Sequence, residues 1–199
     1  MDLLKLGYIP FNAFGLFNAA SKQWGMNALI HPEVACPLNG MRHLIVNCID
    51  KHRWMIVAVD GEGKTYRIID WYEEHRCLAF IGQSQGYLYG MSGPIVVSCK
   101  MSKLSIWVLR DYDTDAWVRK HRVTFAKLFG ILSCKSYSNQ LVAIHPNRNL
   151  IFFIQCWNRK LKSYDMDSEE VRDLCILEYG YHEYNFVGSL LLRVLGAKK

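Results

Sequence analysis

The chain has 199 residues, of which 51% are hydrophobic and 13% aromatic, so an intrinsically disordered protein is excluded and one globular domain is expected. The net charge of +6 at pH 7 is modest and the basic residues are dispersed among acidic ones, so nucleic-acid binding is not expected. No apolar run has the length of a membrane span or the pattern of a secretion signal, which predicts a soluble protein without a membrane partner.

In chain order, the region from His43 to Glu178 consists of short apolar runs, rich in β-branched and aromatic residues and separated by turn residues, which predicts antiparallel strands. Three segments share one layout of strand, four-residue connection ending in lysine, second strand and polar turn. They read "WMIVAVD-GEGK-TYRIIDW", "PIVVSC-KMSK-LSIWVLRDYD" and "LIFFIQC-WNRK-LKSYDMD". The lysines are Lys64, Lys103 and Lys160, and each segment is followed by a further strand candidate: "RCLAFIG", "AWVRKHRV" and "VRDLCILEY".

This repetition predicts an all-β protein of repeated antiparallel sheets, because a small sheet can bury its faces only against neighbouring sheets. The arrangement expected is propeller-like and incomplete, since three units are few for a closed ring, with irregular or helical termini. One short internal helix is predicted around Ser168 to Arg172.

The segment "DYDTDAW", from Asp111 to Trp117, has acidic residues at alternate positions, as a calcium loop has. That loop also needs glycine at its sixth position and glutamate at its twelfth, where this chain has Ala116 and Arg122. The flanking segments favour strands. The segment is therefore predicted to be the loop of a hairpin.

The segment "AVDGEGKT", residues 58–65, fits a loose phosphate-loop pattern, but that chemistry needs a helix directly after it. The residues that follow favour a strand, so a hairpin is predicted here too. His43, His52, His121 and His145 belong to no catalytic motif and are interpreted as hydrogen-bonded strand or turn residues. We expect no enzyme.

Cysteine spacing bears on metal sites and on the compartment. The chain has seven cysteines without a C-x-x-C spacing, which predicts neither a zinc cluster nor a redox motif and indicates a reducing compartment. A cytoplasmic or nuclear protein without metal or cofactor is therefore expected. Two small basic clusters, at residues 119–122 and 159–162, could contact phosphate, but solvated strand faces have the same composition.

The three connections that end in lysine are the candidate partner-binding rim. If each joins the second and third strands of a propeller blade, the three emerge close together. Tryptophan and arginine are frequent in interface hot spots. The candidate residues of this rim are Glu62, Met101, Trp157, Asn158 and Arg159. In the alternative interpretation, Trp157 covers the end of its own sheet.

Four segments, "FIGQSQGYLYGM", "KLSIWVLRDYDTDAWVRKHRV", "AIHPNRNLIFFI" and "KLKSYDMDSEEV", together resemble the F-box-associated region of plant F-box proteins, particularly the large grass families. The resemblance covers residues 43–184, is strongest from Phe80 onwards, and is most specific in the run from Trp107 to His121. It implies a propeller-like domain that binds a target protein for a cullin ubiquitin ligase and itself catalyses nothing.

The family's F-box, which binds the Skp adaptor, opens on a Leu-Pro pair, and none occurs in residues 1–42. The expected organisation is thus an atypical N-terminal segment (1–42), the F-box-associated domain (43–184) and a C-terminal tail (185–199), and adaptor binding is not expected. Two alternatives stay open: a polyanion- or nucleic-acid-binding module, and a truncated product without ligase function.

Overall fold

The computed structural model describes residues 28–48, 53–62, 64–71, 77–92, 103–130, 139–155 and 158–177. These residues form three antiparallel four-stranded sheets, in each of which the strands pair in chain order. The first sheet contains β1 (Ala28–Leu38), β2 (Met41–Cys48), β3 (Arg53–Asp60) and β4 (Tyr66–Asp70). The second contains β5 (Leu78–Ser84), β6 (Tyr87–Ser92), β7 (Lys103–Asp111) and β8 (Ala116–Thr124). The third contains β9 (Asn139–Ile144), β10 (Leu150–Gln155), β11 (Lys160–Asp165) and β12 (Val171–Ile176).

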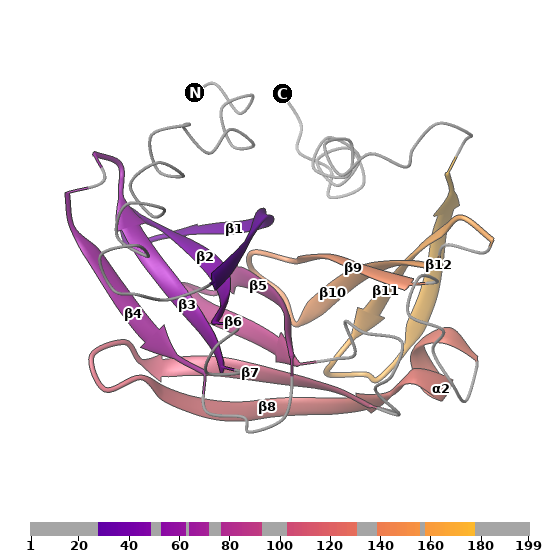
Figure 1. Cartoon of the computed structure of the whole chain (residues 1–199). Coiled ribbons are helices and arrows are strands. Elements are labelled where there is room, and N and C mark those ends of the chain that lie inside the picture. Colours follow the sequence, from indigo (N-terminus) through magenta and orange to yellow (C-terminus); the bar gives the residue numbers. More distant parts are fainter. Residues whose placement is uncertain are drawn as a thin grey trace, which may run out of the picture.

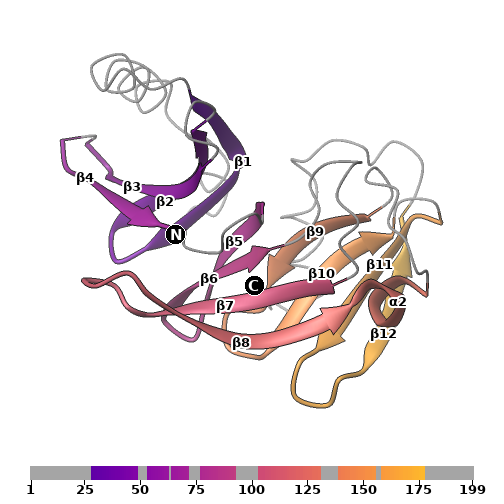
Figure 2. The ribbon, with the colours of Figure 1, turned by 60° about the horizontal axis from the view of Figure 1, so that its bottom comes forward.

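The sheets stand one after another in an open arc, with the second sheet in the middle (Figures 1 and 2). None of the three is closed into a barrel, so each keeps two edge strands within the described residues. The chain is therefore all-β with an incomplete, propeller-like arrangement, as the sequence predicts.

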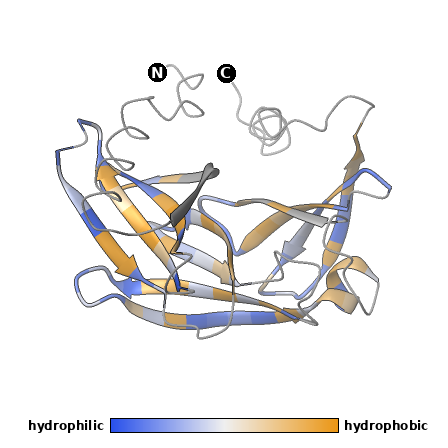
Figure 3. Ribbon diagram, viewed as in Figure 1, coloured by the Kyte–Doolittle hydropathy of each residue, from blue (hydrophilic) through white to orange (hydrophobic). Residues whose placement is uncertain are grey.

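Two apolar clusters join the sheets, one on each face of the second sheet. The first and second sheets share a core of Ile45, Ile56 and Ile69 with Ile81 and Leu88, all at most 2% exposed. The opposite face of the second sheet packs on the third through a cluster that includes Leu104, Ile106, Ile151, Phe153 and Tyr164. Figure 3 shows apolar stretches along β3 and β10, whereas β8 carries a hydrophilic stretch. Alternation along β6 and β7 of the second sheet thus sends successive side chains into the two different inter-sheet cores.

Turn chemistry repeats from sheet to sheet. The first hairpin of the first sheet turns at Asn39 and Gly40, and that of the second at Gln85 and Gly86, all four with positive φ as a two-residue hairpin turn requires. The hairpin between third and fourth strands is in each sheet closed by one aspartate that accepts backbone N–H groups of the turn. These are Asp60, Asp111 and Asp165. They recur about 50 residues apart, close to the length of one propeller blade.

Most strands predicted from the sequence are confirmed, including both strands of the "DGEGK" and "DYDTD" hairpins. The strand candidate "PIVVSC" lies outside the described residues. The grouping of the first predicted unit was wrong, because β3 and β4 belong to the first sheet whereas "RCLAFIG" contributes β5 to the second. Sheet membership depends on long-range packing, which a local pattern does not specify.

The helix predicted around Ser168 to Arg172 is wrong. The Asp165 carboxylate accepts hydrogen bonds from the turn, and Val171 then pairs with Tyr164 as the start of β12. The helix that the described residues contain is α2 (Phe125–Phe129), capped by the Thr124 hydroxyl at its start and by Gly130 with φ of 71° at its end.

The predicted domain boundary at residue 43 falls inside β2, and β1, which belongs to the expected N-terminal segment, is part of the first sheet. The tail at 185–199 lies outside the described residues. Among the described helices none is long and apolar enough to cross a membrane.

Candidate partner-binding site

Of the five predicted rim residues, three lie in the described part of the chain. Glu62 is in the exposed turn between β3 and β4, where its carboxylate lies 2.6 Å from the ammonium of Lys64. Asn158 holds the turn between β10 and β11, since its amide donates to Gln155 (2.8 Å) and its oxygen accepts the backbone N–H of Lys160 (3.2 Å). Arg159 has a positive φ of 54°, and its carbonyl accepts the N–H of Leu177 at 2.8 Å. Met101 and Trp157 lie outside the described residues.

The structure does not bring Glu62 together with Asn158 and Arg159. The β3–β4 turn and the β10–β11 turn lie on opposite sides of the molecule in both views (Figures 1 and 2). The reason is connectivity: "GEGK" joins the third and fourth strands of its sheet, whereas "WNRK" joins the second and third. The described residues therefore do not form a rim from these connections.

The "DYDTD" loop between β7 and β8 binds the first sheet. Arg67 of β4 donates to the Asp113 carbonyl (2.9 Å) and the Asp115 carboxylate (3.0 Å), and its guanidinium stacks on the Tyr112 ring at 4.7 Å. The other Asp115 oxygen accepts the Asp70 N–H at 3.2 Å. Of the acidic residues that suggested a metal loop, Asp111 thus closes its own turn and Asp113 and Asp115 contact the first sheet. In the described residues no group of three metal-ligating side chains converges.

His43 is fully buried beneath this loop. Its Nδ1 lies 3.1 Å from the Cys36 carbonyl oxygen, which can only accept, so Nδ1 carries the proton and Nε2 accepts from the Tyr112 hydroxyl at 2.8 Å. Burial lowers the pKa of His43 by penalising the charged ring, although the hydrogen bond to Cys36 acts in the opposite direction. His43 is therefore a neutral structural link between the first and second sheets.

A second set of polar contacts joins the second and third sheets. His121 of β8 hydrogen-bonds the Tyr164 hydroxyl at 2.7 Å, and burial raises the pKa of Tyr164 to about 12. Lys120 donates to the Tyr89 hydroxyl (2.7 Å) and to Asn149 (2.6 Å). The interpretation of the histidines as hydrogen-bonded strand or turn residues is confirmed for His43 and His121, and for His145, whose ring accepts a backbone N–H; His52 lies outside the described residues.

The two basic clusters of the sequence differ once folded. In the cluster at 159–162, Lys160 and Lys162 both contact the Asp173 carboxylate, at 2.6 and 2.9 Å. In the cluster at 119–122, Lys120 points to the third sheet, whereas Arg119 and Arg122 are exposed and form no ion pair with any described residue. Only this second cluster keeps cations free for a ligand.

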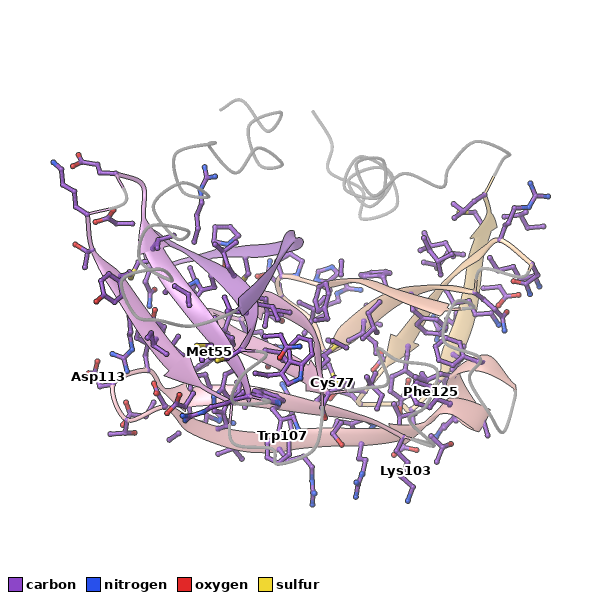
Figure 4. All side chains as sticks on the ribbon, viewed as in Figure 1. Met55, Cys77, Lys103, Trp107, Asp113 and Phe125 are labelled. Atoms are coloured by element: carbon purple, nitrogen blue, oxygen red, sulfur yellow. The ribbon has the colours of Figure 1, made fainter. Side chains whose placement is uncertain are left out.

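The register of β7 and β8 places Arg119 and Arg122 on one face of the second sheet. Arg119 is paired with Trp107 and Arg122 with Ser105, while Lys103 lies two residues further along β7 on the same face. Lys103 is exposed and it too lacks an ion pair within the described residues. Figure 4 shows Lys103 and Trp107 along the same side of the molecule, with Asp113 at the far end of the hairpin. We call Lys103, Arg119 and Arg122 the cation row.

Tryptophans adjoin one end of the cation row. Trp71 packs edge-on against Trp107 and Trp117, with ring centroids 6.2 and 4.9 Å apart, and the Arg119 guanidinium lies 5.8 Å from the Trp107 ring centroid. The Trp107 indole N–H is buried without a hydrogen-bond acceptor, as is the Ser92 hydroxyl, whose residue pairs with Ser105 on the same face. This face therefore presents three exposed cations that form no ion pair with a described residue, above two buried polar groups without hydrogen-bond partners. Sequence reasoning noticed Arg119 and Arg122 but could not relate them to Lys103 and Trp107 without the strand register.

No protein-family model and no curated protein matches the sequence. Among solved structures, apo AztD from Citrobacter koseri is similar with a TM-score of 0.36 and 9% sequence identity, over 74% of this chain and 47% of that one. This chain therefore spans less than half the length of that structure. A likeness this distant supports no conclusion about family or function.

Proposed function

We propose that this chain is the target-binding region of an F-box-type protein and presents another protein to a cullin ubiquitin ligase. Four segments between residues 80 and 171 resemble the F-box-associated region, and this resemblance is the basis of the proposal. These segments supply most of β5 and β6, the β7–β8 hairpin, most of β10, and β11 with the turn that leads into β12. They thus account for most of the second and third sheets.

The observation that carries the proposal is the position of the most specific motif, Trp107 to His121. This run forms the β7–β8 hairpin, and its polar side chains contact both neighbouring sheets: Tyr112 and Asp115 bind the first sheet, and Lys120 and His121 bind the third. The motif residues therefore hold the three sheets together as one scaffold. A scaffold held together in this way can present its exposed edges and loops to a protein partner.

Affinity capture tests the proposal. The purified chain is immobilised and exposed to a plant extract, with an unrelated all-β domain of similar net charge as the control bait. We expect specific enrichment of one or a few proteins, and we expect a fusion of this chain to an F-box to increase ubiquitination of the captured protein in a reconstituted ligase. Recovery of no specific protein, or of nucleic acid alone, would contradict the proposal.

Adaptor binding is a separate prediction. Because residues 1–42 contain no Leu-Pro opening of an F-box, the isolated chain should not bind the Skp adaptor with the affinity usual for the family. Isothermal titration calorimetry of the purified chain with the adaptor measures this, and fusion of an F-box should restore binding. Tight binding by the unfused chain would show that the prediction is wrong.

A further inference from the structure

From the face that carries the cation row, we propose that the second sheet binds an anionic peptide segment of a partner, laid in extended conformation along β8. This inference rests on the proposed role in protein recruitment and names the site and the chemistry of the partner. Lys103, Arg119 and Arg122 are exposed on one face, and none forms an ion pair within the described part of the chain.

Charge complementarity identifies the sign of the partner. Elsewhere on the described surface, several cations have carboxylates beside them: Lys127 contacts Glu169, Lys160 contacts Asp173, and Arg172 contacts Glu170. Arg110 and Arg148 are also exposed without an ion pair to a described residue, but each stands alone, whereas the cation row gathers three such cations on one face. In the cation row no described carboxylate lies beside any of the three cations. Carboxylate or phosphate oxygens from a partner would supply acceptors to the exposed cations.

The backbone of β8 favours a peptide over a nucleic acid. β8 is a nine-residue edge strand that pairs with β7 on one side and with no other described strand. The free side of such a strand can pair with the backbone N–H and C=O groups of an extended peptide. A nucleic acid has no complementary row of peptide groups to offer.

The extent of the positive surface also favours a short ligand. From Lys103 to Trp107 the face extends about 13 Å along β7. Beyond it, at the tip of the hairpin, lie Asp111 and Asp113, both exposed, the Asp113 side chain by 94%. A long polyanion that followed the hairpin would meet these carboxylates, whereas a short acidic segment would end before them. An apolar side chain of such a segment would contact the partly exposed Trp107.

The alternative role of the charges is protection of an edge strand, since lysine and arginine on an edge discourage unwanted strand pairing. Protection of the edge requires only positive charge, and the face of the sheet that carries the charge does not matter. Binding of an anionic peptide at this site depends instead on the face that holds Arg119 and Arg122. The chain offers a matched control for this difference, because Arg110 is exposed on the opposite face of the same hairpin, beside Tyr87, and Arg148 is exposed in the turn between β9 and β10.

The test measures binding of labelled peptides to the full chain by fluorescence anisotropy at low and physiological salt. The probes are a short glutamate-rich peptide with apolar residues between the glutamates, the same peptide with phosphoserine in place of glutamate, and the same peptide with glutamine. The proteins are the unmodified chain, the double variant Arg119→Gln/Arg122→Gln, and the control Arg110→Gln/Arg148→Gln, which has the same net charge. Thermal melting verifies that each variant folds.

We expect the glutamate or the phosphoserine peptide to bind, with affinity that weakens as salt increases, and the glutamine peptide not to bind. The row variant should lose about tenfold or more in affinity and the control variant much less. The two anionic peptides distinguish carboxylate from phosphate recognition. A single-stranded oligonucleotide of similar charge should compete poorly.

Equal loss in both variants, no binding of either anionic peptide, or tighter binding of the oligonucleotide through the same arginines would each overturn the inference. These outcomes differ from failure of the proposed function. If the unmodified chain and the row variant capture the same protein from extract, recruitment stands and this site is wrong. If neither captures a protein while the anionic peptide still binds, the site stands and the recruitment role is wrong.

Discussion

Tyr112 is the residue that ties the hairpin loop of the second sheet to the interior of the first. Its hydroxyl donates to the buried Nε2 of His43, its ring stacks beneath Arg67, and its own pKa is raised by burial. A surface loop residue thus completes the hydrogen bonding of a side chain that is 0% exposed. Buried polar groups of this kind are costly when one partner is removed.

Tyr112→Phe should therefore lower the free energy of unfolding by about 1–3 kcal/mol, because Nε2 of His43 is left without a donor. Urea denaturation followed by tryptophan fluorescence measures the change. Tyr87→Phe is the matched control, since Tyr87 is 40% exposed, and it should change stability by less than about 0.5 kcal/mol. Equal effects of the two substitutions would mean that the buried hydrogen bond does not stabilise the fold.

The pH dependence of stability follows from the histidines. Burial lowers the pKa of His43 and of His121 below the ordinary value of 6.5, so the unfolded chain binds their protons at higher pH than the folded chain does. Their contribution to the free energy of unfolding is complete above pH 6.5 and is lost as the pH falls through the lowered folded pKa values.

We expect the midpoint of urea unfolding to decrease between about pH 7 and pH 5. The ring signals of both histidines, followed by NMR, should titrate with midpoints below 6.5. Stability that rises toward acid pH, or a midpoint for His43 above that value, would contradict the assignment of a neutral, buried ring.

At the scale of elements, the close approach of the first and second sheets depends on Gly90. Gly90 of β6 lies beneath the ring of Trp71, the residue that follows β4, and a Cβ at Gly90 would lie 2.5 and 2.9 Å from two ring carbons. The ring cannot withdraw easily, because Trp107 and Trp117 pack against its other sides. The absence of a side chain at Gly90 therefore permits the contact between the first and second sheets.

Gly90→Ala should destabilise the protein by about 1–3 kcal/mol, as overpacked cores do. Gly61→Ala is the control, because a Cβ at Gly61 meets nothing within 4 Å. Thermal unfolding by circular dichroism gives the comparison. If both variants melt at the temperature of the unmodified chain, the inter-sheet contact is looser than this packing implies.

At the scale of the whole molecule, the three sheets form an open arc, and the strands at the edges of the sheets have no described neighbour on one side. β12 ends the third sheet, and its Leu174 and Ile176 are 37% and 66% exposed. An exposed apolar edge strand is a template for pairing with another chain. The isolated chain is therefore expected to self-associate or to have limited solubility.

Ile176→Lys should shift the chain toward the monomer, because a charge on an edge strand opposes strand pairing. Sedimentation velocity over a concentration series measures the shift. Tyr87→Lys, on the interior strand β6, is the control and should leave association nearly unchanged. A chain that is monomeric at every concentration before any substitution would contradict the expectation.

How much could be predicted from sequence depended on the range of the interactions involved. The all-β class and the hairpins at Asp60 and Asp111 could be predicted because strand alternation and turn chemistry are local, acting over a few residues. The short helix predicted around Ser168 to Arg172 does not form, because the Asp165 carboxylate closes a turn there and Val171 then pairs with β11.

The candidate site could be predicted only in part, because its members are separated in sequence and grouped by register. A bulge in β8 between the partners of Ile106 and Trp107 directs Lys120 to the third sheet and leaves Arg119 beside Trp107. In the sequence Arg119 and Lys120 are equivalent neighbours.

The sequence by itself determined which short segments of this protein form strands and hairpin turns, since those depend on backbone preferences and on alternation within a few residues. The tertiary structure alone decided which strands share a sheet, which polar residues link sheets and which cations stay exposed. Asp115 meets Arg67 across 48 residues of chain, and no local pattern records that contact. The physical reason is that burial and ion pairing depend on the packing of whole sheets, whose edges and faces exist only once the chain has folded.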